Sequence, residues 1–376
     1  MRVKLKELGE VITGNTPSKM ILDYWDSDDI SFVKPDIISD SGITTIVESS
    51  EYLSEKAREK ARIVSENAIF VTCIGSIGKI GIAGPGYYAF NQQINVIVPN
   101  ENVVPKYLAY AMLHSKPQLT AIANAPVVPI INKSQFSDFE INIDADMQKQ
   151  VEIVNVLDKV VGIIQARENE LSKLDDLVKA RFVEMFGLPV SNTKGWKTEQ
   201  MNDVAPSVSY LGDFDDEVWL LNLDMVEAQT GRILDYLIVS KEEVGNSTCT
   251  FDTSNVLYSK LRPYLNKVVM PDRCGYATSE LVPLQPVKSK INREYLAFML
   301  RSDEFVNMIN EKVAGAKMPR VSMGEFRKFD VPVPPMDLQK QFAAFVEQVD
   351  KSKDAVQKSL DKLQILFDKL MQEYFG

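Results

Sequence analysis

Apolar side chains recur with a helical period along two long stretches of this chain. In one stretch, positions spaced alternately by four and three residues run from Phe342 to Tyr374, and nine of the ten are apolar or aromatic. In the other, the matching series runs from Ile153 to Met185, and eight of the ten are apolar. A sustained spacing of about 3.5 residues is typical of helices that pack along another helix. Two separate amphipathic helices, each packed on its own domain, are the alternative interpretation.

Short motifs at both ends of these stretches occur twice. Asp146-Met147-Gln148-Lys149-Gln150 returns as Asp337-Leu338-Gln339-Lys340-Gln341 at an offset of 191 residues. Glu184-Met185-Phe186-Gly187 returns as Glu373-Tyr374-Phe375-Gly376 at an offset of 189. We interpret the change of offset as a short gap inside the helical stretch. The chain therefore reads as two copies of one plan.

A mixed segment precedes each helical stretch. Both segments contain β-like apolar runs, such as Ala68–Ile74 and Val256–Leu261, followed by a helical pattern. We therefore predict an α+β protein with two similar mixed α/β domains, each followed by a long helix. The expected boundaries are a domain at 1–145, a helix at 146–187, a domain at 188–336 and a helix at 337–376.

Composition excludes several classes of protein. The 376 residues are 45% hydrophobic, and 42 basic against 52 acidic residues give a net charge of −10. An acidic chain does not coat nucleic acid by bulk charge, although local basic patches stay open. No window approaches the ~18 apolar residues of a membrane-spanning helix, and the charged first residues are not a signal peptide. Three distant cysteines suggest reduced thiols, so we expect a cytoplasmic protein.

The residues of common catalytic sites are missing from the sequence. The single histidine, His114, cannot build a histidine-dependent triad or a multi-histidine metal site. The glycines from Gly75 to Gly84 lack the spacing of a phosphate-binding loop and favour a tight turn between strands. No Asn-Pro-Pro-aromatic run of an adenine methyltransferase is present. We therefore expect a chain without catalytic residues and without a cofactor or metal of its own.

Local charge differs from the total. Residues 258–273 carry a local excess of +3, residues 312–328 carry +4, and no acidic residue lies between Glu66 and Glu101. A few such cations on one surface suffice for phosphate contacts, and Arg or Asn side chains can pair with base edges. Such excesses also arise by chance on many surfaces, so charge alone leaves DNA binding open.

The ordered set of motifs resembles the specificity subunit of type I restriction–modification systems over essentially the whole chain. The resemblance rests on the doubled helix-start and Phe-Gly motifs and on motifs within each domain. In the first domain these are Thr13–Ser18, Lys34-Pro35-Asp36, Gly75–Gly78 and Asn91-Gln92-Gln93. In the second they are Val256–Lys267, Gly315–Ser322 and Pro332–Pro335. The second domain departs from the pattern because Val204–Ser209 replaces the Thr-Gly-x-Thr-Pro opening.

The resemblance implies a function and an assembly. Each domain would recognise one half of a bipartite site in double-stranded DNA, and the two helices would pair as an antiparallel coiled coil that sets the spacer. The chain would recruit two methyltransferase subunits and the restriction subunits. These partners, rather than this chain, would hold S-adenosylmethionine, ATP and Mg. A stand-alone DNA-binding regulator and a protein-binding coiled-coil scaffold are the alternatives.

Motif matching also implies candidate DNA contacts in each domain. Asn91 and Gln92 either read bases or brace their loop. The candidates of the first domain are Thr16, Ser18, Ser76, Lys79, Asn91, Gln92 and Lys133. The candidates of the second are Lys260, Arg262, Tyr264, Lys267, Lys317 and Arg320.

Overall fold

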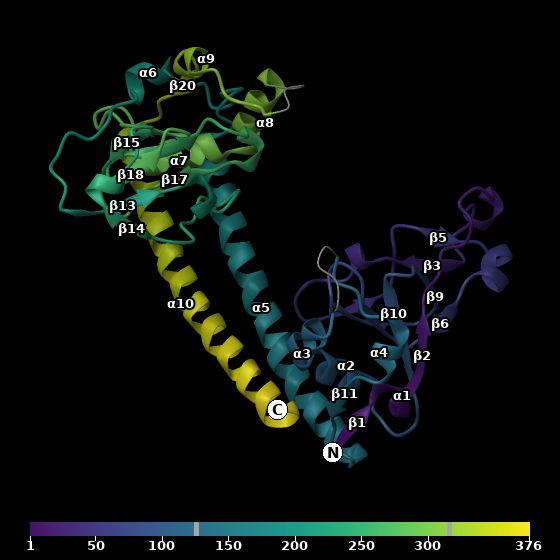
Figure 1. Cartoon of the computed structure of the whole chain (residues 1–376). Coiled ribbons are helices and arrows are strands. Elements are labelled where there is room, and N and C mark those ends of the chain that lie inside the picture. Colours follow the sequence, from purple (N-terminus) through teal and green to yellow (C-terminus); the bar gives the residue numbers. More distant parts are fainter. Residues whose placement is uncertain (124–127, 314–317) are drawn as a thin grey trace. The chain divides into compact units, whose positions relative to one another are not determined.

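The computed structural model describes residues 1–123, 128–313 and 318–376 (Figure 1). The chain forms two compact units, Met1–Arg167 with Ser359–Gly376, and Glu168–Lys358. Two helices of 40 residues, α5 (Met147–Phe186) and α10 (Met336–Phe375), each contribute residues to both units. In the described part of the chain, no helix is both long and apolar enough to cross a membrane. The two predicted long helices are present, whereas the four-segment division at 145, 187 and 336 stays a prediction.

The first unit is built on two main sheets. One has the strand order β2-β10-β7-β8-β4, the other has the order β5-β3-β9-β6, and β1 pairs with β11. Its strands are β1 (Arg2–Lys4), β2 (Gly9–Thr13), β3 (Ile30–Val33), β4 (Ile43–Ile46), β5 (Tyr52–Leu53), β6 (Ile63–Ser65), β7 (Ile69–Thr72), β8 (Ile80–Ala83), β9 (Tyr87–Phe90), β10 (Ile94–Pro99) and β11 (Glu140–Asn142). Its short helices are α1 (Leu5–Leu8), α2 (Pro105–His114), α3 (Lys116–Ala121) and α4 (Lys133–Ser137), with 3-10 turns η1 (Leu22–Tyr24), η2 (Pro35–Ile37) and η3 (Glu55–Lys60).

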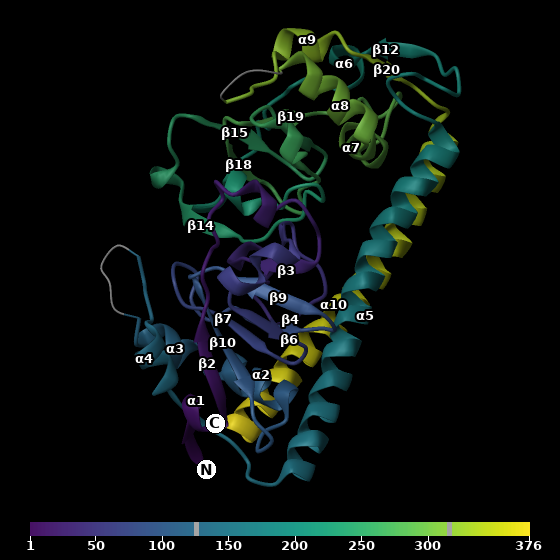
Figure 2. The same ribbon diagram turned by 90° about the vertical axis from the view of Figure 1, so that its right-hand side faces the viewer.

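The second unit repeats this arrangement with fewer strands among the described residues. Its sheets have the orders β14-β13-β18-β15 and β17-β16-β19, and the β12–β20 pair lies next to α6, which in turn contacts α9 (Figure 2). Its strands are β12 (Thr198–Gln200), β13 (Glu217–Leu221), β14 (Leu237–Ser240), β15 (Thr248–Phe251), β16 (Val256–Ser259), β17 (Val268–Val269), β18 (Gly275–Thr278), β19 (Leu281–Leu284) and β20 (Asp330–Pro332). Its helices are α6 (Met201–Val204), α7 (Arg293–Arg301), α8 (Asp303–Lys312) and α9 (Met323–Arg327), with 3-10 turns η4 (Leu223–Met225), η5 (Lys241–Glu243) and η6 (Pro263–Leu265).

Strand pairing confirms that the two units share one plan. Each four-stranded sheet contains a single parallel pair, β3 with β9 in the first unit and β13 with β18 in the second. Strands β7 and β16 occupy equivalent places, and all four residues of each are buried. A strand with neighbours on both sides and cover on both faces is a continuous apolar run, which is the pattern seen in the sequence. The predicted class, two similar mixed α/β domains with long helices, is confirmed.

Each unit contains the start of one long helix and the end of the other. In the first unit, one buried core includes Leu157 from the start of α5 and Phe375 from the end of α10. In the second unit, Phe182 from the end of α5 and Phe342 from the start of α10 lie with ring centroids 5.5 Å apart. Residues late in one helix therefore pack with residues early in the other, which is the antiparallel sense. A coiled coil along the full length of both helices stays a prediction.

A buried glutamine near the start of each long helix makes the same hydrogen bonds in both units. Gln150 and Gln339 are fully buried. The Oε1 atom of Gln150 accepts from the backbone N–H of Val104 at 2.8 Å, and that of Gln339 accepts from Asn292 at 2.8 Å. Each Nε2 group donates to a carbonyl oxygen just ahead of its helix, that of Asp144 at 2.7 Å in the first unit. In the second unit, the acceptor is the Pro334 oxygen at 2.8 Å.

This equivalence corrects the repeat alignment. Gln150 and Gln339 are 189 residues apart, the same offset as the Phe-Gly motifs, and both helices have 40 residues. The expected gap inside the helical stretch is therefore wrong, and the length difference lies ahead of the helices. Each copy of the motif has two glutamines spaced by two residues, so the sequence can be aligned in two ways. The alignment by motif pairs Gln150, which is buried, with Gln341, which is exposed.

Replacing the buried glutamine should destabilise the second unit. Gln339→Leu leaves the Asn292 N–H and the Pro334 carbonyl without their partner, so we expect the free energy of unfolding to fall by about 2–4 kcal/mol. Chemical denaturation of the full chain measures the difference. Gln341→Leu is the matched control, and we expect a change within about 0.5 kcal/mol because Gln341 is exposed. A larger loss for Gln341→Leu would favour the offset of 191.

Candidate nucleic-acid interface

The basic motif of the second domain forms a tight turn between β16 and β17. Arg262 and Asn266 flank the 3-10 turn η6, and both adopt left-handed backbone conformations with φ of 49° and 48°. The Arg262 side chain is exposed, and Tyr264 is 48% exposed. The turn therefore presents a cation and an aromatic ring from one rigid element.

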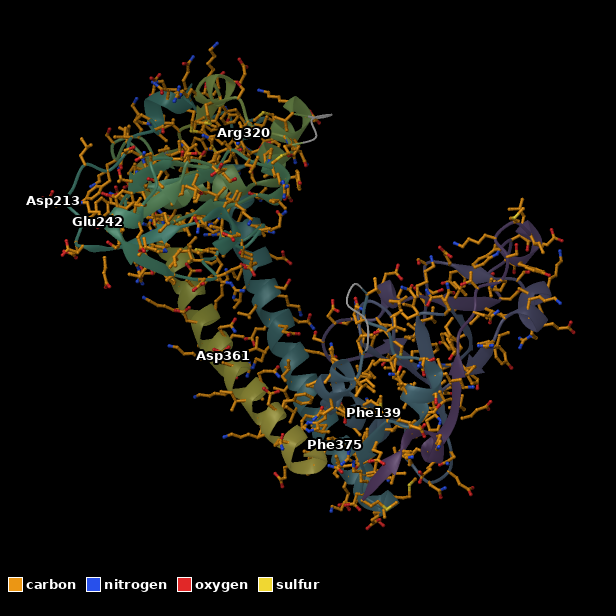
Figure 3. The ribbon with its side chains drawn as sticks, in the orientation of Figure 1. Phe139, Asp213, Glu242, Arg320, Asp361 and Phe375 are labelled. Atoms are coloured by element: carbon orange, nitrogen blue, oxygen red, sulfur yellow. The ribbon has the colours of Figure 1, made fainter. Side chains whose placement is uncertain are left out.

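A second basic segment lies beside this turn. The Arg262 backbone N–H donates to the Pro319 oxygen at 2.8 Å, and the Val321 N–H donates to the Lys260 oxygen at 2.8 Å. A β-bridge between Leu261 and Arg320 completes the contact. Arg320 is exposed on the second unit (Figure 3), so the fold brings two candidate arginines together from distant parts of the sequence.

Other candidate cations of the second domain differ in their surroundings. Lys267 donates from its Nζ atom to the Leu223 carbonyl oxygen at 2.8 Å, and burial lowers its pKa. This lysine braces the turn and is not a free surface cation. Lys260 is half-buried. Lys317 lies outside the described residues.

The glycine motif of the first domain forms the equivalent turn. Gly75 donates its backbone N–H to the Pro129 oxygen at 3.0 Å, and Ile131 donates to the Cys73 oxygen at 2.8 Å. These two bonds match the Arg262–Pro319 and Val321–Lys260 bonds of the second domain. Ser76, next to Gly75, is exposed. Both domains therefore carry the same turn, braced by the same later segment.

The polar candidates near the start of the first domain form a small exposed group. Thr16 donates from Oγ1 to Oε1 of Gln92 at 2.9 Å, and both residues are exposed, as is Ser18. Asn91 is only 8% exposed and bonds through Nδ2 to Oε1 of Gln93 at 2.8 Å. Burial and the bond to Gln93 favour the role of bracing the loop for Asn91. The exposed Gln92 keeps both roles, base reading and bracing, open.

The two candidate lysines of the first domain are also unlike each other. The Lys79 side chain is 12% exposed, and its Nζ atom lies 3.1 Å from Oδ1 of Asp40. Lys133 is exposed at the first position of α4, behind an N-cap formed by Asn132. Lys133 is therefore available to an anion, whereas Lys79 is already paired.

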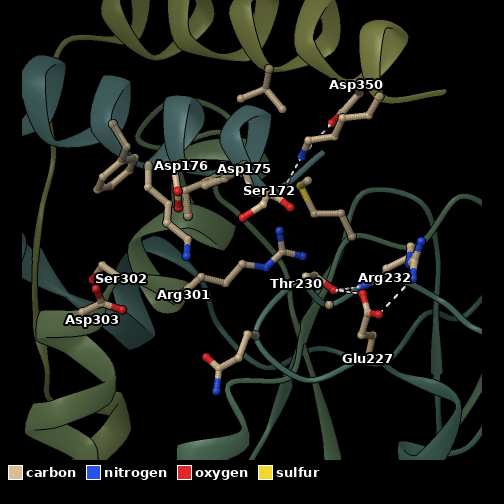
Figure 4. A pocket seen from close by; sticks show the side chains of 18 of the residues that line it. Ser172, Asp175, Asp176, Glu227, Thr230, Arg232, Arg301, Ser302, Asp303 and Asp350 are labelled. Atoms are coloured by element: carbon tan, nitrogen blue, oxygen red, sulfur yellow. Dashed lines mark hydrogen bonds and ion pairs between the residues drawn. The ribbon is translucent and has the colours of Figure 1, made fainter. Parts of the chain in front are cut away.

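A cavity of about 950 Å³ lies behind the turn of the second domain. Arg301, at the end of α7, points into it, with Asp175 and Asp176 of α5 on one side and Glu227 on the other (Figure 4). Burial lowers the pKa of Arg301 to about 10, which leaves it charged at neutral pH. Seven acidic and four basic residues line the cavity, so its charge does not suit a phosphate backbone.

Several residues that shape the turn were not expected from the sequence. Gln229 donates from Nε2 to the Tyr264 oxygen at 3.0 Å, and Asn266 donates from Nδ2 to the Arg301 oxygen at 2.9 Å. Gly231 follows Gln229 with a φ of 68° and lies close to Val268. For Gln229 and Gly231, the short Gln-Thr-Gly run was the signal in the sequence, but a Gly after polar residues marks a turn and does not say what the turn supports.

Comparison with known proteins shows the family of this chain. Residues 1–174 and 229–364 match the family model described as the type I restriction modification DNA specificity domain. The chain belongs to this family. The match covers most of both halves, including both turns of the candidate interface.

Curated relatives of the specificity-domain family extend the comparison. The EcoDI specificity subunit of Escherichia coli is 19% identical, with 78% of this chain and 77% of that protein covered. The MjaIX specificity subunit of Methanocaldococcus jannaschii is 21% identical, with 98% of this chain and 90% of that protein covered.

Solved structures agree with the fold. The type I restriction–modification S subunit from M. genitalium superposes with a TM-score of 0.56 at 15% identity, covering 100% of this chain and 96% of that one. A chain from a structural study of assembly and conformational transition in the type I system gives 0.59 at 14%, covering 100% and 97%. At 14–15% identity, this similarity supports the fold of the chain and nothing beyond the fold.

Substitution of the partnered lysines and of the exposed lysine should have different effects on stability and on DNA binding. Lys267→Met and Lys79→Met each remove a hydrogen bond or ion pair of a partly buried ammonium group, so we expect the free energy of unfolding to fall by about 0.5–2 kcal/mol. The salt dependence of DNA binding should not change, because neither cation is free. Denaturation and binding at several salt concentrations measure both effects.

Lys133→Met is the matched control in the same experiment. We expect unchanged stability. The slope of the logarithm of the DNA-binding constant against the logarithm of the salt concentration should be smaller by about one, as for a lost phosphate contact. A lower salt slope with unchanged stability for Lys267→Met would mean that Lys267 contacts DNA.

Proposed function

We propose that this chain is the non-catalytic subunit that selects the DNA site of a type I restriction–modification enzyme. Each domain recognises one half of a bipartite site in double-stranded DNA, and the paired helices set the distance between the halves. One observation carries the proposal: the same exposed turn, braced by the same later segment, occurs once in each domain. Duplicated reading elements suit a site with two half-sites.

Acidic composition fits a subunit that binds DNA within a larger assembly. The net charge of −10 opposes binding of DNA over a broad surface. The exposed Arg262 and Arg320 supply local cations at one turn, which is enough for a few contacts but not for tight binding alone. We therefore propose that methyltransferase subunits bind this chain and provide the remaining affinity.

Chemistry belongs to the partners in this proposal. Two methyltransferase subunits would carry S-adenosylmethionine, and restriction subunits would carry ATP and Mg. Residues 1–123, 128–313 and 318–376 contain no cluster of three His, Cys, Asp or Glu side chains able to hold a metal. The assembly would act in the cytoplasm, where it meets the DNA that it modifies.

Mapping of methylated adenines tests the proposal directly. We expect the chain co-expressed with the methyltransferase subunit of its own system to direct methylation to one bipartite sequence. The purified chain alone should transfer no methyl group and should bind duplex DNA weakly. Tight, site-specific binding by the chain alone would favour a stand-alone regulator, and no binding to any duplex with or without partners would favour a protein scaffold.

A change in helix length tests the spacer role. Insertion of seven residues into both α5 and α10 keeps the heptad phase and adds ~10 Å, or about three base pairs of B-form DNA. We expect the spacer of the methylated site to lengthen by about this amount while both half-sites stay the same. The insertion in α5 alone is the control, and it should abolish site-specific methylation because the helices no longer match. Altered half-sites in the double insertion would contradict the spacer role.

A further inference from the structure

The turn at Arg262 contains backbone that most residues avoid. Among the described residues, five that are not glycine have positive φ, and three of them, Gln229, Arg262 and Asn266, lie in this turn or against it. Asparagine tolerates the left-handed region, whereas an arginine there is disfavoured by contact between Cβ and the backbone. The Oδ1 atom of Asn266 is also buried without a hydrogen-bond partner among the described residues. Such strain persists where the surroundings enforce it, often at functional sites.

The first domain shows that the fold does not require a side chain at this position. Gly75 occupies the place of Arg262, with a φ of 78° and the equivalent backbone hydrogen bond. A Cβ atom added at Gly75 would meet nothing within 4 Å. Glycine adopts this conformation without strain. The arginine of the second domain is therefore not there for the turn itself.

Packing does not explain the arginine either. The Arg262 side chain is exposed, and within the described residues its guanidinium group makes no hydrogen bond or ion pair. Its backbone N–H and carbonyl are both used, by Pro319 and by Leu265. The backbone of Arg262 is thus held at a fixed point of the surface, while the five guanidinium donors have no partner among the described residues.

A neighbouring loop holds the turn from the inner side. Gln229 donates its backbone N–H to the Leu265 oxygen at 3.0 Å and its side-chain Nε2 to the Tyr264 oxygen at 3.0 Å. In the same unit, the Arg301 Nε atom donates to the Val268 oxygen at 3.1 Å, in the strand that follows the turn. The two bonds from Gln229 join the loop to the carbonyls of Tyr264 and Leu265.

We propose that Arg262 is a specificity-determining residue that reads a guanine in the half-site of the second domain. Gln229 is a positioning residue that fixes the turn presenting it. Arginine recognises the O6 and N7 atoms of guanine through two parallel hydrogen bonds, which need a defined approach to the base edge. The inference rests on the proposed function and adds the residue, the base and the asymmetry between the two domains. The equivalent turn of the first domain offers backbone at Gly75 instead of a cation.

The test compares methylation patterns of variants in the full chain, co-expressed with the methyltransferase subunit. For Arg262→Gly, we expect discrimination for guanine at one position of one half-site to fall about 10- to 100-fold. The other half-site serves as an internal reference and should not change. The thermal midpoint of the purified chain should stay the same or rise, because glycine relieves the left-handed backbone.

Further variants separate the roles of charge, geometry and position. Arg262→Lys keeps the charge but not the paired donors, so we expect partial loss at the same position. Gln229→Met keeps the length of the side chain but not its donor, and we expect a several-fold loss at the same position. Gln200→Ala is the matched control, because Gln200 is exposed in the same unit and its side chain makes no capping bond. We expect no change for this control.

Distinct outcomes would overturn each part. A lower thermal midpoint with an unchanged methylation pattern for Arg262→Gly would make the arginine structural. A uniform loss across all sequences would make it a phosphate contact, and relaxation of both half-sites would make the effect global. An unchanged pattern for Gln229→Met would remove the positioning role. A wild-type chain that directs no sequence-specific methylation would refute the proposed function itself, whatever the variants do.

Discussion

One aromatic contact in each unit ties the long helices to the recognition domains. Tyr107 of α2 lies 5.0 Å from Phe375, and Tyr295 of α7 lies 4.8 Å from Phe186, measured between ring centroids. Each domain thus packs against the end of one long helix. The glutamine near the start of the other long helix is hydrogen-bonded to that same domain. Because each unit needs parts of both helices, neither domain is complete without the far half of the chain. The geometry of any reading surface depends on this exchange.

The two domains use a common framework for different surfaces. The equivalent turns have matching backbone hydrogen bonds, but the first carries Gly75 and the second carries Arg262. Two other candidate lysines already have partners within the chain, because Lys79 pairs with Asp40 and Lys267 donates to a backbone carbonyl. For the proposed DNA binding, the exposed cations at the turn therefore matter more than the total charge suggests.

Much of the architecture could be predicted from local patterns. The spacing of about 3.5 residues from Ile153 to Met185 and from Phe342 to Tyr374 predicted two long helices, because burial on one side of a helix imposes that period. Every position of both series is buried or half-buried. The repeat was also visible, but its alignment at the helix start was wrong. Letters alone do not separate the buried Gln339 from the exposed Gln341.

The sequence by itself determined the duplicated plan, the two helices and the family to which the chain belongs, since each depends on short-range periodicity or on ordered motifs. Only the tertiary structure decided which cations are free, which glutamine anchors each helix and how Arg320 comes to lie beside Arg262. Those features depend on hydrogen bonds and burial between residues far apart in the chain, as with Gln229 and Tyr264 or Lys79 and Asp40. Local propensity carries no record of such partners, because the free energy of a polar side chain is set by what surrounds it after folding.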